Sequence, residues 1–413
     1  MLLIAGAGAG AAAGFIACGF YCIQRHARPN PTGWNRIVEA RIIGSVDRAA
    51  AIAVAGGDVK GRGPVERPAV SRRAVLGAGA LAALGLGGSL AGCSPLISDG
   101  GLRPDGTVRV SHYLTPSYTD LEPSIAQFAK NVDARLGEGA ADVYGAGTLL
   151  NSDQTLNGLL RAVADVAMQT SSFVSTSFPI LGAIELPFSG ADYPTLKEAV
   201  SPHSDLRKTF NAEFAKKGVM SVGTIMCPTE WIYTVNRPVT KPEDIRGLRI
   251  RVSGHVEGAM LKALGAAPVA LSSAEVYEAL ERGTVDGMVS YPGTVVSRSL
   301  QDVLRYATIG HFGAYTYDAY ANLDWFNSVP QEVREAVHDS GRVFSVDGTK
   351  LAKDVQDDEY MPVFESSGIE LIELDKSQTR QFRNATKWVE DWWRNKVGDD
   401  DLADRALEQV RNP

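Results

Sequence analysis

Cysteine is scarce in this chain: the 413 residues contain four, and only Cys227 lies beyond residue 93. The other three are Cys18, Cys22 and Cys93. A single cysteine in the body of the chain can form neither an internal disulfide nor a cysteine metal site. We therefore expect Cys227 to be a buried apolar residue.

Recognisable catalytic and nucleotide-binding motifs are also missing. The six histidines are scattered, and none lies in an H-E-x-x-H arrangement. The sequence has neither a G-x-S-x-G nucleophile motif nor a G-x-x-x-x-G-K phosphate loop. His112 and His255 are better explained as hydrogen-bonded polar residues than as general bases. These absences favour a binding protein, with no cofactor and no metal, over an enzyme.

Positive charge is deficient outside the first part of the chain. Residues 1–92 hold ten basic and four acidic residues, a net charge of +6, whereas the remaining chain holds 31 and 44, a net charge of −13. Nucleic-acid binding depends on neutralising phosphates, so an acidic body predicts no nucleic-acid partner. An anion bound by this body must be held by a local positive site, because the overall field opposes its capture.

The front of the chain has the pattern of an export signal. Residues 71–93 read SRRAVLGAGALAALGLGGSLAGC, in which Arg72 and Arg73 precede nineteen uncharged residues, six of them glycine. So weakly apolar a stretch suits an export signal better than a permanent membrane span. Its start resembles the twin-arginine export motif, and its end resembles a lipobox that would place lipid on Cys93. The alternative is a membrane helix followed by a chance cysteine.

These motifs predict how the front of the chain is organised. Residues 71–92 would be the signal peptide and 93–104 a lipidated tether, and two or more acyl chains would anchor the protein stably to the membrane. Residues 1–70 are interpreted as a leader extension of uncertain status. The uncharged stretch 1–24 leaves open whether it is an upstream extension of the reading frame or an unusually long leader.

The body alternates strand and helix patterns, which is typical of an α/β protein with largely parallel sheets. Two successive sheet-building units predict two lobes, since ~320 residues exceed what one core usually serves. We assign 105–229 plus 317–358 to lobe I and 230–316 plus 359–413 to lobe II. The stretch 314–324 is long enough to be a strand shared between the lobes. A helical pattern from Pro330 to about Ser366 would reach ~55 Å, long enough to bridge both lobes.

A short stretch reading GLRIRVSG, residues 247–254, carries the strongest binding signal. Apolar residues alternate with Arg249 and Arg251, so a strand here would place both guanidinium groups on one face. From the residues alone, two interpretations of Arg251 are equally supported: an ordinary salt bridge and an anion-binding site. Gly254 and the helix that follows could add N–H donors and a favourable dipole.

Residues 236–290, which include NRPVTKPEDIRGLRIRVSG and ALSSAEVYEALERGTVDGMVS, resemble the solute-binding proteins of tripartite ATP-independent periplasmic (TRAP) transporters, the DctP-like family. The upstream motifs LLNSDQTLNGLLRAVADVAM and IELPFSG are similar to that family's first lobe, and the resemblance covers roughly residues 107–411. It implies a two-lobed periplasmic-binding-protein-like fold of type II-like architecture. It also implies that Arg251 binds the ligand carboxylate, whereas Arg249 is expected to be a surface or structural residue.

Other ligand-pocket positions transfer less completely from the family. The position of the family's second basic ligand residue is occupied by Trp231 here. Ser290 stands where the family commonly has an asparagine, and Ser273 stands where it has an aromatic residue. Loss of one cation together with gain of Trp231 leads us to expect a monocarboxylate with an apolar or ring-bearing body. The remaining pocket candidates lie at strand ends, and they are His112, Tyr113, Thr170, Ser171 and Tyr291.

The expected function is that of an exported receptor that delivers a small organic acid to TRAP permease subunits, without chemistry. A receptor of the same fold serving a signalling sensor is the alternative. A secreted α/β enzyme is a third possibility, for which no nucleophile is identifiable.

Overall fold

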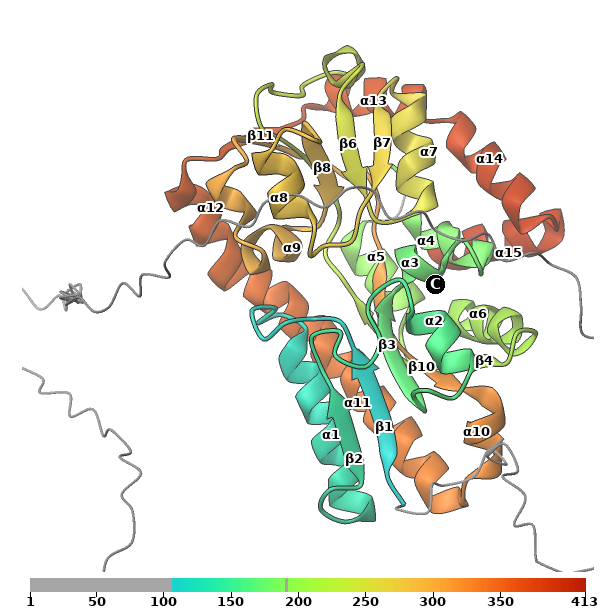
Figure 1. Ribbon diagram of the computed structural model, residues 1–413. Helices are drawn as coiled ribbons and strands as arrows, with labels where there is room; N and C mark the ends of the chain where they lie inside the picture. Colours follow the sequence, from blue (N-terminus) through green and yellow to red (C-terminus); the bar gives the residue numbers. More distant parts are fainter. Residues whose placement is uncertain (1–105, 190–191) are drawn as a thin grey trace, which may run out of the picture. The chain divides into compact units, whose positions relative to one another are not determined.

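The computed structural model describes residues 106–189 and 192–413, which build two separate β-sheets covered by helices (Figure 1). We call the elements packed on the first sheet lobe I and those packed on the second sheet lobe II. The predicted two-lobed α/β fold is therefore confirmed.

The first sheet has five strands in the order β2-β1-β3-β10-β4. Strand β1 pairs in parallel with β2 and β3, whereas β10 runs antiparallel between β3 and β4. Every residue of β3 and β10 is buried, as expected for central strands covered on both faces. The strands are β1 (Val108–His112), β2 (Ala141–Tyr144), β3 (Val166–Thr170), β4 (Val219–Met226) and β10 (Thr316–Asn322).

The second sheet has six strands in the order β11-β9-β5-β8-β6-β7. Strands β6, β7 and β8 pair in parallel, as do β9 and β11, and β5 runs antiparallel between β8 and β9. The strands are β5 (Trp231–Thr234), β6 (Arg249–Val252), β7 (Ala267–Ala270), β8 (Gly287–Ser290), β9 (Tyr306–Ile309) and β11 (Glu370–Glu373).

Two expectations about the sheets are corrected. Each sheet is mixed rather than largely parallel, because one internal strand of each runs against its neighbours. The strand expected over 314–324 is β10, which pairs only within the first sheet and is not shared between lobes. The connection between the sheets is instead made by segments 227–230 and 312–315, which lie side by side: Cys227 N donates to Tyr315 O (3.2 Å) and Glu230 N to Gly313 O (2.9 Å).

Short helices cover both sheets. Those between β1 and β4 are α1 (Glu122–Leu136), α2 (Thr155–Leu160), α3 (Ser171–Val174), η1 (Pro179–Leu181), α4 (Gly182–Glu185), α5 (Tyr193–Ala199) and α6 (Asp205–Ala215). Those between β5 and β9 are η2 (Pro242–Ile245), α7 (His255–Ala263), α8 (Val276–Glu281), α9 (Pro292–Ser297) and η3 (Leu300–Asp302). Helix α10 (Leu323–Ser328) follows β10 directly.

The predicted long helix is confirmed. Helix α11 (Gln331–Val355) continues through a π-helical turn, η4 (Gln356–Tyr360), into α12 (Met361–Ser367), which makes 37 residues in all. Its first part packs on α1 and β4 of lobe I, and its last part contacts α9 and η3 of lobe II (Figure 1). One rigid element is thus anchored in both cores.

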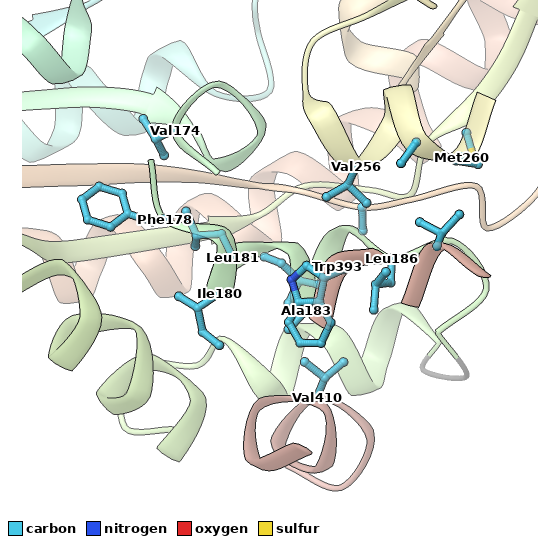
Figure 2. Packing of buried hydrophobic residues seen from close by; sticks show 14 of the residues in the cluster. Val174, Phe178, Ile180, Leu181, Ala183, Leu186, Val256, Met260, Trp393 and Val410 are labelled. Atoms are coloured by element: carbon cyan, nitrogen blue, oxygen red, sulfur yellow. The ribbon is translucent and has the colours of Figure 1, made fainter. Parts of the chain in front are cut away.

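The C-terminal helices contact both lobes as well. Helix α13 (Lys376–Ala385) packs on η2, α14 (Trp388–Val397) packs on α7 and η1, and α15 (Asp400–Arg411) packs on α4, α5 and α6. Trp393 is fully buried among residues of η1, α4 and α7, and its Nε1 donates to Pro179 O at 2.7 Å (Figure 2). The division of residues 359–413 between the lobes stays a prediction.

Cys227 is buried and free, as expected from its isolation in the sequence.

Candidate functional site

Arg251 is the central residue of the candidate site. It lies near the end of β6, its side chain is only 2% exposed, and its Nε donates to Leu271 O at 2.9 Å. No carboxylate oxygen of the described residues lies within 4 Å of its guanidinium group. A buried guanidinium is normally paired because an isolated charge is costly to desolvate. This arginine is therefore left with bonding capacity for a further anion.

Arg249 behaves differently although it shares the same face by parity. Its guanidinium binds both carboxylate oxygens of Asp286, Nε to Oδ2 at 3.1 Å and Nη2 to Oδ1 at 2.7 Å, and its side chain is 47% exposed. Arg249 is thus a surface residue held in an ion pair with Asp286, as expected. Burial rather than strand parity separates the two arginines.

Of three buried carboxyl groups near the site, two interact electrostatically with Arg251 and the third interacts with those two; none of them was predicted from the sequence. They belong to Glu185 at the end of α4, Glu230 between the two sheets, and Glu257 in the first turn of α7, each 3% exposed or less. Their only signal in the sequence is a lone glutamate within an apolar run, as in CPTEWIY and GAIELPF.

Glu257 also corrects the expectation that the start of α7 offers free donors. Its carboxylate accepts hydrogen bonds from Ser253 N (2.8 Å) and Ser253 Oγ (2.5 Å). The backbone of Gly254 also hydrogen-bonds to it. The chain itself therefore uses these donors.

Burial raises the pKa of all three carboxyl groups. The pKa of Glu185 rises to about 8 because the group is desolvated, although hydrogen bonds from Ser171 and Ser175 oppose the rise. The pKa of Glu230 is raised well above its usual range by burial and by the neighbouring Glu257 and Glu185, with Arg251 opposing. The pKa of Glu257 is raised by burial, which Arg251 and the Ser253 contacts partly offset.

The raised pKa of Glu185 predicts a pH-dependent stability. Between its ordinary pKa of 4.5 and about 8, the folded protein retains a proton that the unfolded chain has released, so stability falls as pH rises through this window. The slope from this one group is about 1.4 kcal/mol per pH unit. We expect Glu185→Gln to raise the melting temperature of the unliganded protein at pH 8 but not at pH 4.5.

The exposed Glu243 provides the control for this experiment, since Glu243→Gln changes no buried charge. Scanning calorimetry at the two pH values measures both variants. If the melting temperatures of wild type and Glu185→Gln differed by the same amount at both pH values, the raised pKa of Glu185 would be contradicted.

The lobe I candidates cluster at the ends of β1 and β3. The Tyr113 ring lies near Phe173 (centroids 6.0 Å apart) and near Tyr317 (6.3 Å), and its hydroxyl bonds Thr170. Arg251 acts electrostatically on the Tyr113 hydroxyl. Ser171 is buried, and its Oγ accepts from Thr316 N at 3.2 Å. Tyr113, Thr170 and Ser171 therefore belong to the same region as Arg251.

His112 has a different environment. Its ring is buried, and a Cβ placed on Gly145 would lie 2.8 Å from its Nε2. Burial lowers the pKa of His112 to about 4, so the ring is neutral at physiological pH. No contact of the described residues links His112 to Arg251.

The lobe II candidates fall into two groups. Trp231 is 6% exposed, and its ring packs near Tyr233 (6.1 Å) and Phe364 (6.0 Å) inside lobe II. Ser290 is its partner on the neighbouring strand β8. The role expected of Trp231 as a wall for a ligand ring stays a prediction, and its described contacts are those of a core residue.

Tyr291 and Ser273 reach towards lobe I. The Tyr291 ring stacks edge-on against Tyr315 at 5.5 Å. Ser273 Oγ accepts from Arg298 Nη2 (3.2 Å), and Arg298 Nε donates to the Tyr118 hydroxyl (3.2 Å), which links the two lobes. Arg298 and Tyr118 were not predicted from the sequence, because nothing in the local pattern marks them.

A second set of contacts joins the lobes beside Arg251. Ser172 Oγ donates to Ser253 Oγ at 3.2 Å, and His255 Nδ1 lies 3.2 Å from the hydroxyl groups of Ser175 and Thr176. With the Tyr118–Arg298 link, these contacts bring both lobes onto the region around Arg251. A separate cavity of about 400 Å³ between α1 and α11, lined in part by Pro123, Phe344 and Leu351, contains none of the predicted ligand residues.

The family model described as bacterial extracellular solute-binding protein, family 7 (DctP), matches residues 110–395 of this chain. The chain belongs to this family. DctP-family proteins bind solutes and are not enzymes, which agrees with the missing catalytic motifs.

Individual relatives are distant but match over most of their length. The C4-dicarboxylate-binding periplasmic protein DctP of Rhodobacter capsulatus is 24% identical over 328 residues, which are 76% of this chain and 96% of that protein. A TRAP periplasmic solute-binding protein from Ralstonia eutropha, solved with bound (S)-2-acetolactate, superposes with a TM-score of 0.68 at 23% identity, covering 75% of this chain and 99% of that one. DctP7 of Bordetella pertussis, a receptor binding pyroglutamic acid, gives 0.67 at 23% identity, with 74% and 99% covered.

Some of the predicted features lie outside the described residues. The twin-arginine signal, the lipobox with Cys93 and the leader extension all fall before residue 106. Within 106–189 and 192–413, no helix combines the length and apolarity needed to cross a membrane. In the same residues, no group of three or more histidine, cysteine, aspartate or glutamate side chains is arranged to hold a metal ion.

If the two lobes close on the ligand, binding should be sensitive to an added side chain at Gly254. A Cβ there would lie 2.9 Å from Ser172 Cβ and 3.0 Å from Ser172 O, both on the opposite lobe. We expect Gly254→Val to hold the lobes apart and to weaken ligand binding by about tenfold or more, about 1.4 kcal/mol. The melting temperature of the unliganded protein should change little, because the clash lies between lobes and not within one.

Gly258, in the same helix α7, supplies the control, because a Cβ there meets only Pro268 Cβ at 3.9 Å. Gly258→Ala should retain full affinity in equilibrium titrations. Unchanged affinity in Gly254→Val would show that the contact between Ser172 and Gly254 plays no part in closure.

Proposed function

We propose that this protein is an extracytoplasmic receptor that captures a small organic acid by its carboxylate and delivers it to the membrane subunits of a TRAP transporter. The observation that carries the proposal is the buried guanidinium of Arg251, which has no carboxylate within 4 Å among the described residues. A guanidinium is a rigid fork matched to a carboxylate and keeps its charge at every physiological pH.

The energetics support micromolar capture. Each hydrogen bond to a charged group contributes roughly 1.5–3 kcal/mol, so a bidentate pair supplies a large part of the ~8 kcal/mol of micromolar binding. Burial of the site strengthens the interaction, because bulk water does not screen it. The relatives named above for C4-dicarboxylates, acetolactate and pyroglutamic acid bind carboxylates, which supports the same ligand class here.

Two measurements test the proposed function. Thermal-shift titration of the full-length protein with a panel including succinate, pyroglutamate and apolar monocarboxylates should identify a stabilising acid, since a ligand at a hundred times its Kd adds ~2.7 kcal/mol. Uptake of that acid should be lost when the gene is deleted and restored by the wild-type gene but not by Arg251→Ala. Binding of no carboxylic acid, or uptake that persists without the protein, would overturn the proposal.

We also propose that the receptor is held at the membrane by lipid on Cys93. The expected result is incorporation of labelled palmitate into the wild-type protein and none into Cys93→Ser, which should be released in soluble form. Cys227→Ser is the matched control, because the Cys227 thiol is buried in the folded protein. Equal labelling of wild type and Cys93→Ser would rule out the anchor.

A further inference from the structure

Buried carboxyl groups lie near Arg251 without pairing with it. Glu230 and Glu257 are buried close to this arginine, Glu185 is buried beside them, and none of the four side chains forms an ion pair within 4 Å among the described residues. Arg251 nevertheless acts electrostatically on both Glu230 and Glu257.

The fold accounts for Glu257 but only in part for the other two, since Glu185 hydrogen-bonds to Ser171 and Ser175 and the Glu230 side chain hydrogen-bonds to that of Glu257. Glu257 binds the Ser253 N–H and hydroxyl at the start of α7, where the helix dipole also favours an anion. Glu185 Oε1 and Glu230 Oε1 are buried without any hydrogen-bond partner. An unsatisfied buried polar atom costs about 1–3 kcal/mol, so two at one place call for a specific explanation.

These two glutamates meet at the crossing between the sheets. A Cβ placed on Gly313 would lie 2.4 Å from Glu230 Oε2 and 3.3 Å from Glu185 O. Glu230 is also tied to this crossing by its backbone, through Glu230 N to Gly313 O and Phe312 N to Glu230 O. The Glu230 carboxyl group is therefore fixed in place beside Gly313.

We propose that the acid captured by this receptor is zwitterionic: Arg251 binds its carboxylate, while Glu230, assisted by Glu185, binds a cationic ammonium or related group of the same molecule. This inference rests on the proposed function and narrows the ligand class. A cationic group supplies N–H donors to the two unpartnered oxygens, Glu185 Oε1 and Glu230 Oε1. A ligand that carries only carboxylate groups has no N–H donor and would leave both oxygens without a partner.

A metal ion is a poorer explanation of the same oxygens, since the described residues offer no arrangement of three or more ligating side chains.

Matched ligand pairs test the inference directly. Isothermal titration of the full-length protein would compare amino acids with analogues that have no amine: leucine with 4-methylpentanoate, β-alanine with propanoate, and proline with cyclopentanecarboxylate, in which CH2 replaces the ring NH. In whichever pair contains a ligand, we expect the amino acid to bind at least about 100-fold more tightly than its amine-free analogue. Glu230→Gln should reduce this preference to less than about tenfold while leaving the affinity for the amine-free acid unchanged or improved.

Three controls make the outcomes separable. Glu243→Gln, at an exposed position, should change neither affinity, and Glu185→Gln should reduce the preference partially. Melting curves of each variant establish that it is folded, and Glu185→Gln serves as the reporter should Glu230→Gln not fold. Equal or tighter binding of the amine-free acids through Arg251 would overturn this inference and leave the proposed function intact, whereas binding of neither class would overturn both.

Discussion

Replacing Arg251 by alanine is expected to lower the affinity for the organic acid by about 100-fold or more. The loss follows from two charge-assisted hydrogen bonds at roughly 1.5–3 kcal/mol each, with 1.4 kcal/mol equal to a factor of ten. The remaining carboxyl groups of Glu230 and Glu257 would then face the ligand carboxylate without a compensating cation. Arg251→Lys should recover only part of the affinity, because an ammonium group lacks the planar fork.

Arg249→Ala is the matched control for this experiment. Arg249 lies two residues away on the same strand, but its guanidinium is bound to Asp286 at the surface. Loss of this exposed ion pair should change stability little and leave ligand affinity unchanged. Equilibrium titration measures the ligand affinity of each variant, and circular dichroism establishes that the variants are folded. Full affinity in Arg251→Ala would remove the basis of the proposed function.

The largest effect on stability is expected at Gly341, where the long helix α11 crosses strand β4. A Cβ on Gly341 would lie 2.1 Å from Val222 O and 2.6 Å from Val222 C, and these are backbone atoms that cannot rotate away. The opposing Gly223 is equally tight, with a Cβ 2.7 Å from Gly341 O. Two glycines therefore permit a helix–strand contact closer than any side chain would allow.

Gly341→Val is expected to lower the free energy of unfolding by about 3 kcal/mol, because α11 must move off the sheet to relieve the overlap. Arg342→Val is the control, since it places the same side chain at the next, exposed position of α11. Denaturant unfolding of both variants measures the difference. Similar midpoints for the two variants would show that α11 and β4 can separate at little cost.

Much of the architecture is encoded locally and could be predicted. Apolar patterning predicted the alternation of strands and helices, although β5 and β9 were not predicted, and the sustained 3.6-residue pattern after Pro330 predicted the bridging helix. The C-terminal helical segment is less simple, because α13 ends at Ala385 and α14 begins at Trp388. The interruption places Trp393 in the core and leaves Trp388 42% exposed. Such a break depends on packing against η1 and α7, which local pattern does not contain.

The candidate site was predicted only in part, for a related reason. Arg251 stands out because two arginines alternate with apolar residues, and its resemblance to the family position gives it a role. Glu185, Glu230 and Arg298 carry no periodic signal, and their importance comes from neighbours that are distant in the chain. Glu230, for example, is held at the crossing by its backbone bonds with Phe312 and Gly313.

By itself the sequence determined the α/β class, the bridging helix and a strand in which two arginines alternate with apolar residues, because these follow from side-chain periodicity along the chain. Only the tertiary structure decided that Arg251 is buried with no carboxylate within 4 Å among the described residues, that Glu230 lies near it with one unpartnered oxygen, and that the lobes touch at Gly254. Burial and charge balance are properties of groups brought together in space. They arise when segments far apart in sequence exclude water from the same volume.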